Sequence, residues 1–251
     1  MKKVLLTRQD NSALAEILKN SGIETISLPL IECSYNVNKD DASEYFDELS
    51  NYSWITFSSP NAVRGFFKAF FAEFDDIRSL GIARIACVGE ATAKELKKFY
   101  IRADIIPSTQ TGKAMAEAMQ AYESLEHLNV LSVCGNLALP DLANTLDSYK
   151  AIVDVFKVYE TSLVEIDEKS VEVKNFKKTG ADVVVFASPS AVESFVKNAE
   201  KLALNDKATK PKVVAIGTTT AEAVKKYGMK VAEVAISPKP EDIAIAVQNV
   251  I

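Results

Sequence analysis

The segment Trp54–Phe67, which reads WITFSSPNAVRGFF, decides the fold because the chain contains a second copy of it. The second copy is Val183–Val196, VVVFASPSAVESFV, and six of the fourteen paired positions are identical. In each copy an apolar run is followed by Ser-Pro and then by apolar residues at helical spacing. This pattern predicts a buried strand that turns directly into a helix, with Ser59 and Ser188 as N-caps and a proline at the first helical position.

The start of each of these two helices is a candidate anion site. We expect the N–H groups of residues 61–63 and 190–192 to lack partners inside their helices and to face whatever lies beyond the strand's end. The helix dipole favours an anion at this position. The polar residues of the two helix starts are therefore candidate substrate-binding residues: Ser58, Ser59, Asn61, Ser188 and Ser190.

A second pair of segments repeats this arrangement. Ile85–Lys98, IACVGEATAKELKK, matches Val213–Lys226, VVAIGTTTAEAVKK, which lies about 128 residues further on. In both, a strand ends at a glycine and hydroxyl or acidic residues begin a helix, and we expect Gly217 to have a positive φ. Two matched blocks in the same order indicate an internal duplication. This pair adds six candidate binding residues: Glu90, Thr92, Gly217, Thr218, Thr219 and Thr220.

The composition is that of a soluble globular protein with room for two domains. The chain has 251 residues, 48% of them apolar and 25% charged, and its net charge is −5. It has no basic patch that would suggest nucleic acid and no run of about 20 apolar residues that would span a membrane. The first residues, MKKVLLTRQD, lack a secretion signal and the three cysteines are far apart, so we expect a cytoplasmic protein.

Val- and Ile-rich strands alternate with helices along the chain, which is typical of parallel sheets covered by helices on both faces. Each half supplies five strands, one of them at Ala103–Ile106, so we expect two flavodoxin-like, doubly wound α/β domains. Polar connectors are predicted at Pro29–Asp41 and Thr161–Ser170. A division near Tyr122–His127 and a division at the two connectors both give five strands on each side, and the pattern does not choose between them.

No common catalytic constellation is present. The single histidine, His127, precedes a strand on a polar run, no cysteine pair has metal-ligand spacing, and no Walker A or G-x-G motif occurs. We therefore expect neither a metal nor a nucleotide cofactor. The polar helix starts remain, and in doubly wound sheets they lie at the edge where ligands bind. They predict a large anionic ligand held mainly by backbone N–H groups, and Thr7-Arg8 is one of these polar helix starts.

Several short motifs in a fixed order carry a resemblance that covers the whole chain. They are Thr7-Arg8 after the first strand, FSSPNAV, VGEATA, VYET, FASPSAV, IGTTTA and a late SPKPED. In order and spacing they resemble the uroporphyrinogen-III synthase family. The resemblance implies a cofactor-free, monomeric lyase of two α/β domains joined by a two-stranded linker. It favours the division at the connectors, with domains 1–35 plus 162–251 and 36–161, and with Cys33–Asn38 and Tyr159–Glu165 as the crossing strands.

The implied reaction, in haem biosynthesis, closes the linear tetrapyrrole hydroxymethylbilane to uroporphyrinogen III. Water is lost, and ring D is inverted through a spiro intermediate. The substrate's eight carboxylates suit an array of helix starts, where Thr219 and Thr220 would hold some of them. Tyr159, in VYET, takes the role of the acid or water-orienting phenol for the departing hydroxyl. Little else is needed from side chains beyond a cavity that enforces the spiro geometry.

Two other classes of protein fit the same pattern. One is a two-domain protein that closes on a small anionic solute, against which the missing secretion signal counts in its periplasmic form. The other is a glycosyl- or phosphoryl-transferring α/β enzyme, but the sequence has no acidic metal-binding pair and no phosphate loop. The porphyrin isomer formed from hydroxymethylbilane would separate the three classes.

Overall fold

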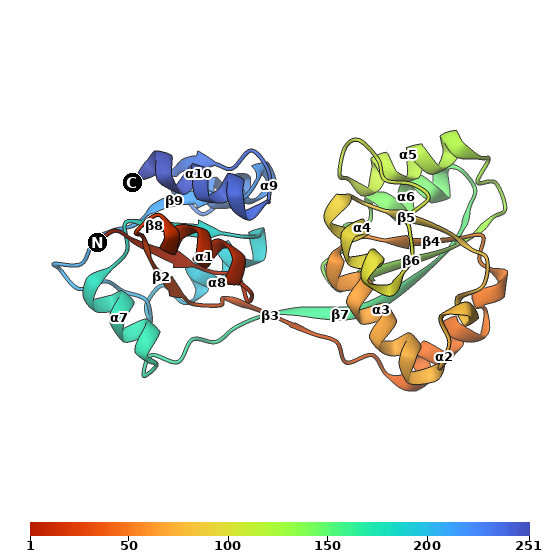
Figure 1. The fold of residues 1–251 in the computed structure, drawn as a ribbon, viewed down its shortest axis with the longest axis horizontal. Helices are drawn as coiled ribbons and strands as arrows, with labels where there is room; N and C mark the ends of the chain where they lie inside the picture. Colours follow the sequence, from red (N-terminus) through yellow and green to blue (C-terminus); the bar gives the residue numbers. More distant parts are fainter. The chain divides into compact units, whose positions relative to one another are not determined.

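The computed structural model describes all residues 1–251, and the chain divides into two compact units. Unit 1 consists of Met1–Glu32 and Ser162–Ile251, and unit 2 is Cys33–Thr161. In Figure 1 the red and blue ends of the chain both belong to unit 1, whereas the orange to green middle forms unit 2. Each unit contains one five-stranded sheet.

Unit 1 is a parallel sheet with helices on both faces. Its strand order is β10-β9-β8-β1-β2, and the neighbouring strands are parallel. One face packs against α1 and α10, and the other packs against α7, α8 and α9. The strands are β1 (Lys3–Leu6), β2 (Glu24–Ser27), β8 (Val183–Phe186), β9 (Lys212–Ala215) and β10 (Val231–Val234). The helices are α1 (Ser12–Asn20), α7 (Val171–Thr179), α8 (Pro189–Lys197), α9 (Thr218–Lys226) and α10 (Pro240–Val250).

Unit 2 has the same layered construction. Its strand order is β3-β7-β6-β4-β5, with α2, α3 and α4 on one face and α5 and α6 on the other. The strands are β3 (Ile31–Ser34), β4 (Trp54–Phe57), β5 (Arg84–Cys87), β6 (Asn129–Gly135) and β7 (Ile152–Leu163). The helices are α2 (Lys39–Asp47), α3 (Pro60–Glu73), α4 (Glu90–Leu96), α5 (Gly112–Tyr122) and α6 (Asp141–Ser148), with short 3₁₀ turns at Leu49–Asn51, Ile77–Leu80 and Lys97–Phe99.

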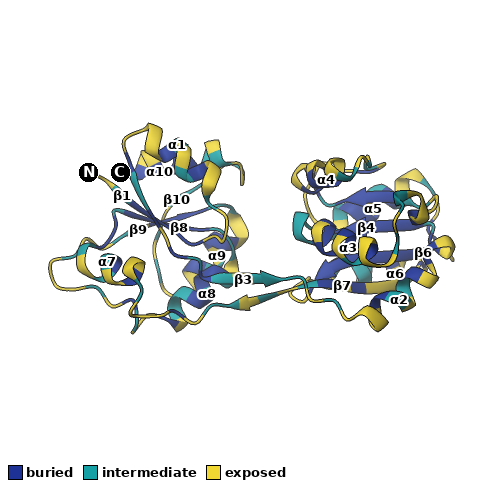
Figure 2. Ribbon diagram, turned by 60° about the horizontal axis from the view of Figure 1, so that its bottom comes forward, coloured by how far each residue is buried: buried dark blue, intermediate teal, exposed yellow.

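The central strands carry the two Ser-Pro motifs. Every residue of β4 and of β8 is buried, and Figure 2 shows these strands in dark blue inside their units. Both are flanked by parallel neighbours, which explains why they are continuous apolar runs rather than alternating ones. The predicted strand-to-helix turns and the predicted doubly wound α/β fold are therefore confirmed. No helix of either unit has the length and apolar character needed to cross a membrane.

The two sheets share one strand order, as the duplication predicts. The order β7-β6-β4-β5 in unit 2 corresponds to β2-β1-β8-β9 in unit 1. The counterpart of β10 is Ala103–Ile106, where the structure has only a single parallel bridge between Ile105 and Ala86. The predicted strand there is therefore wrong. The carboxylate of Asp104 accepts a hydrogen bond from the N–H of Ile85 at 2.7 Å, which replaces a ladder bond.

The two predicted connectors are shorter than expected because strands extend into them. Ile31–Ser34 forms β3, and β7 continues to Leu163 beside it. Both strands cross from one unit to the other, and the first segment of unit 1 ends at Glu32. Cys33 and Thr161, the first and last residues of unit 2, contact each other, with the Cys33 sulfur 3.6 Å from the Thr161 hydroxyl. The division into domains 1–35 plus 162–251 and 36–161 stays a prediction.

Candidate functional site

The start of α3, at the carboxyl end of β4, is capped by Ser59. The Ser59 hydroxyl accepts the N–H of Ala62 at 3.0 Å, and its carbonyl accepts the N–H of Val63 at 3.3 Å. The predicted cap is confirmed, but the expectation that residues 61–63 have free N–H groups is wrong for two of the three. The cap leaves the Asn61 N–H for a ligand. Ser58, next to it, donates its N–H to the carbonyl of Val133 at 3.2 Å.

Tyr159 lies beside this helix start, and the sequence pattern could not show this proximity. It is half-buried on β7, opposite Gly135 of β6, and its hydroxyl lies 3.1 Å from the Ser59 hydroxyl. The ring packs directly on Gly135, because a Cβ built on Gly135 would lie only 2.4 Å from the ring carbon Cζ. Gly135 therefore makes the space in which the phenol sits.

The hydrogen-bond arrangement leaves the Tyr159 hydroxyl with a proton to donate. Ser59 accepts the Ala62 N–H and donates its single hydroxyl proton to the Tyr159 oxygen. Burial raises the pKa of the Tyr159 phenol above its ordinary value, and the hydrogen bond from Ser59 acts in the opposite direction. Since the ordinary value is already about 10, the phenol is neutral near pH 7 and can act as a proton donor.

A chain of polar contacts continues from this site and includes residues that the sequence analysis missed. The Tyr35 hydroxyl donates to Asn61 Oδ1 at 2.8 Å, and Arg64 donates to the same oxygen at 3.0 Å. The Tyr35 ring centroid lies 6.3 Å from that of Tyr159. Arg64 also donates twice to the buried carboxylate of Glu95, at 2.9 and 3.0 Å. Asn61, a predicted site residue, is thus held in one orientation.

A cavity of about 250 Å³ adjoins Tyr159 within unit 2. Its polar wall includes Asn136, which directly follows β6 and exchanges two hydrogen bonds with the backbone of Thr161 at 2.8 and 3.2 Å. The position of Asn136 just beyond a strand's carboxyl end was the signal that could have identified it. The residues that line the cavity are Ser34, Asn36, Asn136, Lys157, Val158, Tyr159 and Glu160.

Two predicted residues of unit 2 lie outside this group of contacts. Glu90 is exposed and Thr92 is buried at the start of α4, and no hydrogen bond joins either to Tyr159 or Ser59. The Gln110 side chain packs against Gly89 there, since a Cβ on Gly89 would lie 2.6 Å from its Oε1 atom. The structure therefore does not join Glu90 and Thr92 to the Tyr159 group.

In unit 1 the start of α8 repeats the α3 cap. Ser188 accepts the N–H of Ala191 at 3.1 Å through its hydroxyl, and the Ser188 and Ser190 hydroxyls lie 2.9 Å apart. The Val192 N–H bonds to the Ser188 carbonyl at 3.3 Å, so the expectation of free donors at residues 190–192 fails as it does in α3. Of these three N–H groups, only that of Ser190 is left without a partner in the helix.

The start of α9 is different, because its N-cap is Gly217 and no side chain caps it. The N–H groups of Thr218, Thr219 and Thr220 precede the first helical hydrogen bond, which Ala221 donates to Gly217 at 3.0 Å. Thr218 and Thr219 are exposed, whereas Thr220 is buried. This uncapped first turn is the clearest candidate anion site of unit 1.

The conformation predicted for Gly217 is wrong. Its φ is −177°, which is extended backbone open to any residue, and no atom lies within 4 Å of a Cβ built there. Glycine is itself a common N-cap, and this role does not require a positive φ. A valine at this position is therefore sterically allowed.

Arg8 is exposed just beyond β1. It lines a cavity of about 160 Å³ together with Asn11, Ala187 and Ile216, which come from the ends of neighbouring strands and the start of α1. Ser188 follows Ala187 directly, and Gly217 follows Ile216. Arg8 therefore lies at the sheet edge that carries the α8 and α9 starts, although it makes no hydrogen bond to Ser188 or Ser190.

The position of the Tyr159 phenol depends on the absence of a side chain at Gly135. Gly135→Ala should push the phenol away from Ser59. Because Tyr159 is the predicted acid and small misplacements of such a group are costly, we expect kcat to fall by about tenfold. Steady-state kinetics would measure this, with circular dichroism to check folding. In a Tyr159→Phe background the same substitution should cost little more, since both changes act on one hydroxyl. Full additivity of the two losses would contradict the assignment.

The fold and these groups define a duplicated α/β protein with a neutral phenol at one sheet edge and an uncapped helix start at another. Residues 12–244 match the family described as Uroporphyrinogen-III synthase HemD, and the chain belongs to this uroporphyrinogen-III synthase family. The resemblance noted in the sequence is confirmed. The alternatives, a solute-binding protein and a glycosyl-transferring enzyme, are not favoured by this match.

Individual relatives agree with the family match. The porphyrin biosynthesis protein HemD of Ruminiclostridium josui is 30% identical over 230 residues, which are 91% of this chain but 44% of that protein. The uroporphyrinogen-III synthase of Chlorobaculum parvum is 28% identical over 240 residues, 92% of each chain. The structure of uroporphyrinogen-III synthetase from Helicobacter pylori superposes with a TM-score of 0.67 at 17% identity, covering 99% of both chains, and shows the shared fold.

Proposed function

We propose that the chain carries out the lyase reaction of its family, the closure of hydroxymethylbilane to uroporphyrinogen III in tetrapyrrole biosynthesis. The observation that carries this proposal is the Tyr159 phenol, protonated and held by Ser59 at the carboxyl edge of the unit 2 sheet. The substrate already contains every carbon of the product. A proton donor and a set of carboxylate-binding groups therefore suffice.

Tyr159 supplies the proton in the first step. The substrate's terminal C–O bond breaks, the phenol protonates the departing hydroxyl, and the lone pair of the adjacent pyrrole nitrogen takes the place of the lost bond. Water and a phenolate result. Ring D then attacks this electrophile at its substituted carbon, which forms the spiro intermediate, and bond cleavage and re-closure invert the ring. The final loss of a ring proton returns a proton to the phenolate, so the protein ends the cycle unchanged.

The substrate's carboxylates are bound mainly by helix starts. The first turn of α9 offers the N–H groups and hydroxyls of Thr218, Thr219 and Thr220 next to Gly217. Ser188 and Ser190 add hydroxyls at the start of α8, Arg8 adds a guanidinium, and Asn61 adds an N–H at the start of α3. Donors of this kind let a protein with a net charge of −5 bind a polyanion. Ser58, Glu90 and Thr92 remain weaker candidates for the same role.

The isomer of the product tests this function. Freshly prepared hydroxymethylbilane, incubated with the protein and then oxidised, should yield the type III porphyrin, whereas closure without ring inversion gives the type I isomer. Chromatographic separation of the two isomers measures the result, with a reaction lacking protein as the control. If type I alone forms at saturating protein, the proposed activity is wrong.

We infer further that the protein acts as a monomer in the cytoplasm and binds neither nucleic acid nor membranes. The acidic charge balance and the absence of a basic patch support the second part. Light scattering at two protein concentrations would test the oligomeric state directly.

A further inference from the structure

Unit 1 contains a large apolar cavity away from the helix starts described above. Its volume is about 900 Å³, within the range of about 300–1,000 Å³ typical of small-molecule sites. Val184 and Val213, the second residues of β8 and β9, and Val231, the first of β10, line it. Because the ligand edge of this sheet lies at the other ends of these strands, the cavity is distinct from the proposed carboxylate sites.

The duplication provides an internal comparison for this cavity. The lining residues Val184, Phe195, Val213, Met229 and Val231 correspond, at the same offsets as the matched segments, to positions in the packed core of unit 2. Those counterparts are Ile55, Phe66, Ile85, Ile101 and Ala103. The same positions therefore line a cavity in unit 1 and belong to the aromatic-rich core cluster in unit 2.

The cause of the difference can be read from the helices above the two sheets. In unit 2, α3 runs to Glu73, and its residues Phe67 and Phe70 are fully buried. In unit 1, α8 ends at Lys197, and the corresponding residues are Val196 and Ala199. Two phenylalanine rings are thus replaced by small side chains. Phe66 packs against both rings, at centroid distances of 5.2 and 5.9 Å, and its counterpart Phe195 in the lining lacks these partners.

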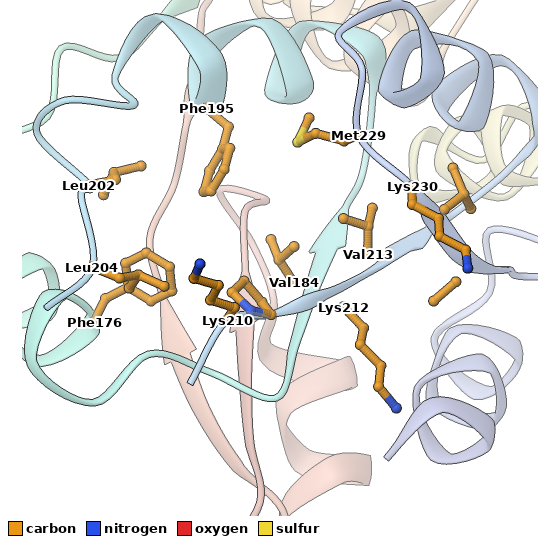
Figure 3. A pocket seen from close by; sticks show the side chains of 13 residues that line it. Phe176, Val184, Phe195, Leu202, Leu204, Lys210, Lys212, Val213, Met229 and Lys230 are labelled. Carbon is orange, nitrogen blue, oxygen red and sulfur yellow. The ribbon is translucent and has the colours of Figure 1, made fainter. Parts of the chain in front are cut away.

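The rim of the cavity is positively charged. Ten of the thirteen lining residues are apolar, three are lysines and none is acidic, in a chain whose net charge is −5. Lys212 donates to the Val250 carbonyl at 2.7 Å, and Figure 3 shows its amine and that of Lys230 directed away from the cavity. The Lys210 side chain lies beside Phe176 and Leu204 in Figure 3, and its ammonium makes no ion pair or hydrogen bond within the chain.

We infer that this cavity binds an amphipathic monocarboxylate with an acyl-chain body. The apolar chain occupies the space above β8 and β9, and the carboxylate pairs with the Lys210 ammonium at the rim. Aliphatic side chains such as Leu202, Leu204 and Met229 form an irregular lining that suits a flexible chain better than a flat ring. Lys230 is also unpaired but is directed away from the cavity, so Lys210 alone offers an ammonium beside the apolar lining, which matches a single anionic head group.

Methionine methyl groups provide a direct probe. The chain has four methionines, of which Met229 lines the cavity, while Met115 and Met119 are fully buried in unit 2. In protein labelled with ¹³C at the methionine methyls, dodecanoate should shift the Met229 resonance in a saturable manner and leave those of Met115 and Met119 unchanged. Dodecan-1-ol, which has the same chain without the charge, should bind about fivefold more weakly.

Two variants with a matched control identify the site. Lys210→Gln should weaken dodecanoate binding about fivefold without affecting dodecan-1-ol, whereas Lys207→Gln, in the same loop but outside the lining, should change neither. Leu204→Trp should fill the cavity and abolish both titrations. Far-UV circular dichroism, which reports on both units, verifies that unit 1 is folded in each variant.

Several results would overturn the inference. An unshifted Met229 resonance at saturating dodecanoate would show that no acyl chain enters. Equal losses of dodecanoate affinity in Lys210→Gln and Lys207→Gln would show that the effect comes from the overall charge of the protein and not from a bond to Lys210. Tighter binding of a flat porphyrin dicarboxylate than of dodecanoate would show that the cavity prefers a flat ring to an acyl chain. A Met229 resonance that shifts with protein concentration in the absence of ligand would show that the cavity is an interface between copies of the chain.

Discussion

Tyr159→Phe should lower kcat by about tenfold to a few hundredfold while leaving the affinity for product nearly unchanged. The substitution removes only the hydroxyl, and the ring that packs on Gly135 remains. The loss is partial because the substrate's pyrrole nitrogen also drives the departure of the hydroxyl. Steady-state kinetics with hydroxymethylbilane and titration with uroporphyrinogen III would measure the two effects separately. An unchanged kcat would remove Tyr159 from the mechanism.

A matched control is available in the same unit. Tyr52 is buried and its hydroxyl donates to Asp154 at 2.8 Å, but it lies ahead of β4, at the end of the strand away from Ser59. Tyr52→Phe should therefore reduce stability modestly, by about 1–2 kcal/mol, without changing kcat. Equal losses of kcat in the two variants would point to a general effect of losing a buried hydroxyl.

The pH dependence follows from the direction of the Tyr159 pKa shift. An acid catalyst is active in its protonated form, so kcat is retained below its pKa and falls as the pH rises through it. Burial raises this pKa above about 10, and the fall should therefore begin only in the alkaline range. Ser59→Ala removes a hydrogen bond that lowers the pKa, and should shift the fall to still higher pH. Tyr159→Phe should lack this fall.

The parts of the fold that rest on local signals could be predicted from the sequence. Ser-Pro after an apolar run determines the strand end, the cap and the first helical residue within a few positions, and both copies form as expected. The predicted strand at Ala103–Ile106 is wrong for a reason that local signals could not show, because the bond from Ile85 to the Asp104 side chain is a tertiary contact. Gly217 was misjudged because glycine serves equally at N-caps and at positive-φ turns.

The candidate site depends on contacts between distant parts of the chain, and these are largely invisible in the sequence. Ser59 and Tyr159 are 100 residues apart, yet their hydroxyls lie 3.1 Å from each other. Tyr35 falls in a stretch without periodicity, so no pattern indicated that its hydroxyl would orient Asn61. The helix starts could be assigned residue by residue, whereas the groups of residues that meet at each sheet edge required the strand order.

The stability of unit 2 should depend strongly on Phe66, and that of unit 1 much less on its counterpart Phe195. Phe66 is fully buried, and five aromatic rings lie within 6.4 Å of its own. Phe66→Ala should therefore lower the free energy of unfolding of unit 2 by about 3–5 kcal/mol. Phe195 is half-buried beside the 900 Å³ cavity, so Phe195→Ala should cost unit 1 only about 1–2 kcal/mol.

The single tryptophan makes this comparison measurable. Trp54 is buried in unit 2, so its fluorescence during urea denaturation reports on that unit, while circular dichroism reports on both. Phe66→Ala should move the fluorescence midpoint to lower urea, and Phe195→Ala should leave it in place because two units need not unfold together. Equal shifts of the fluorescence midpoint in the two variants would show that the units unfold as one. Equal losses measured separately for each unit would show that the packing around the two phenylalanines is equivalent.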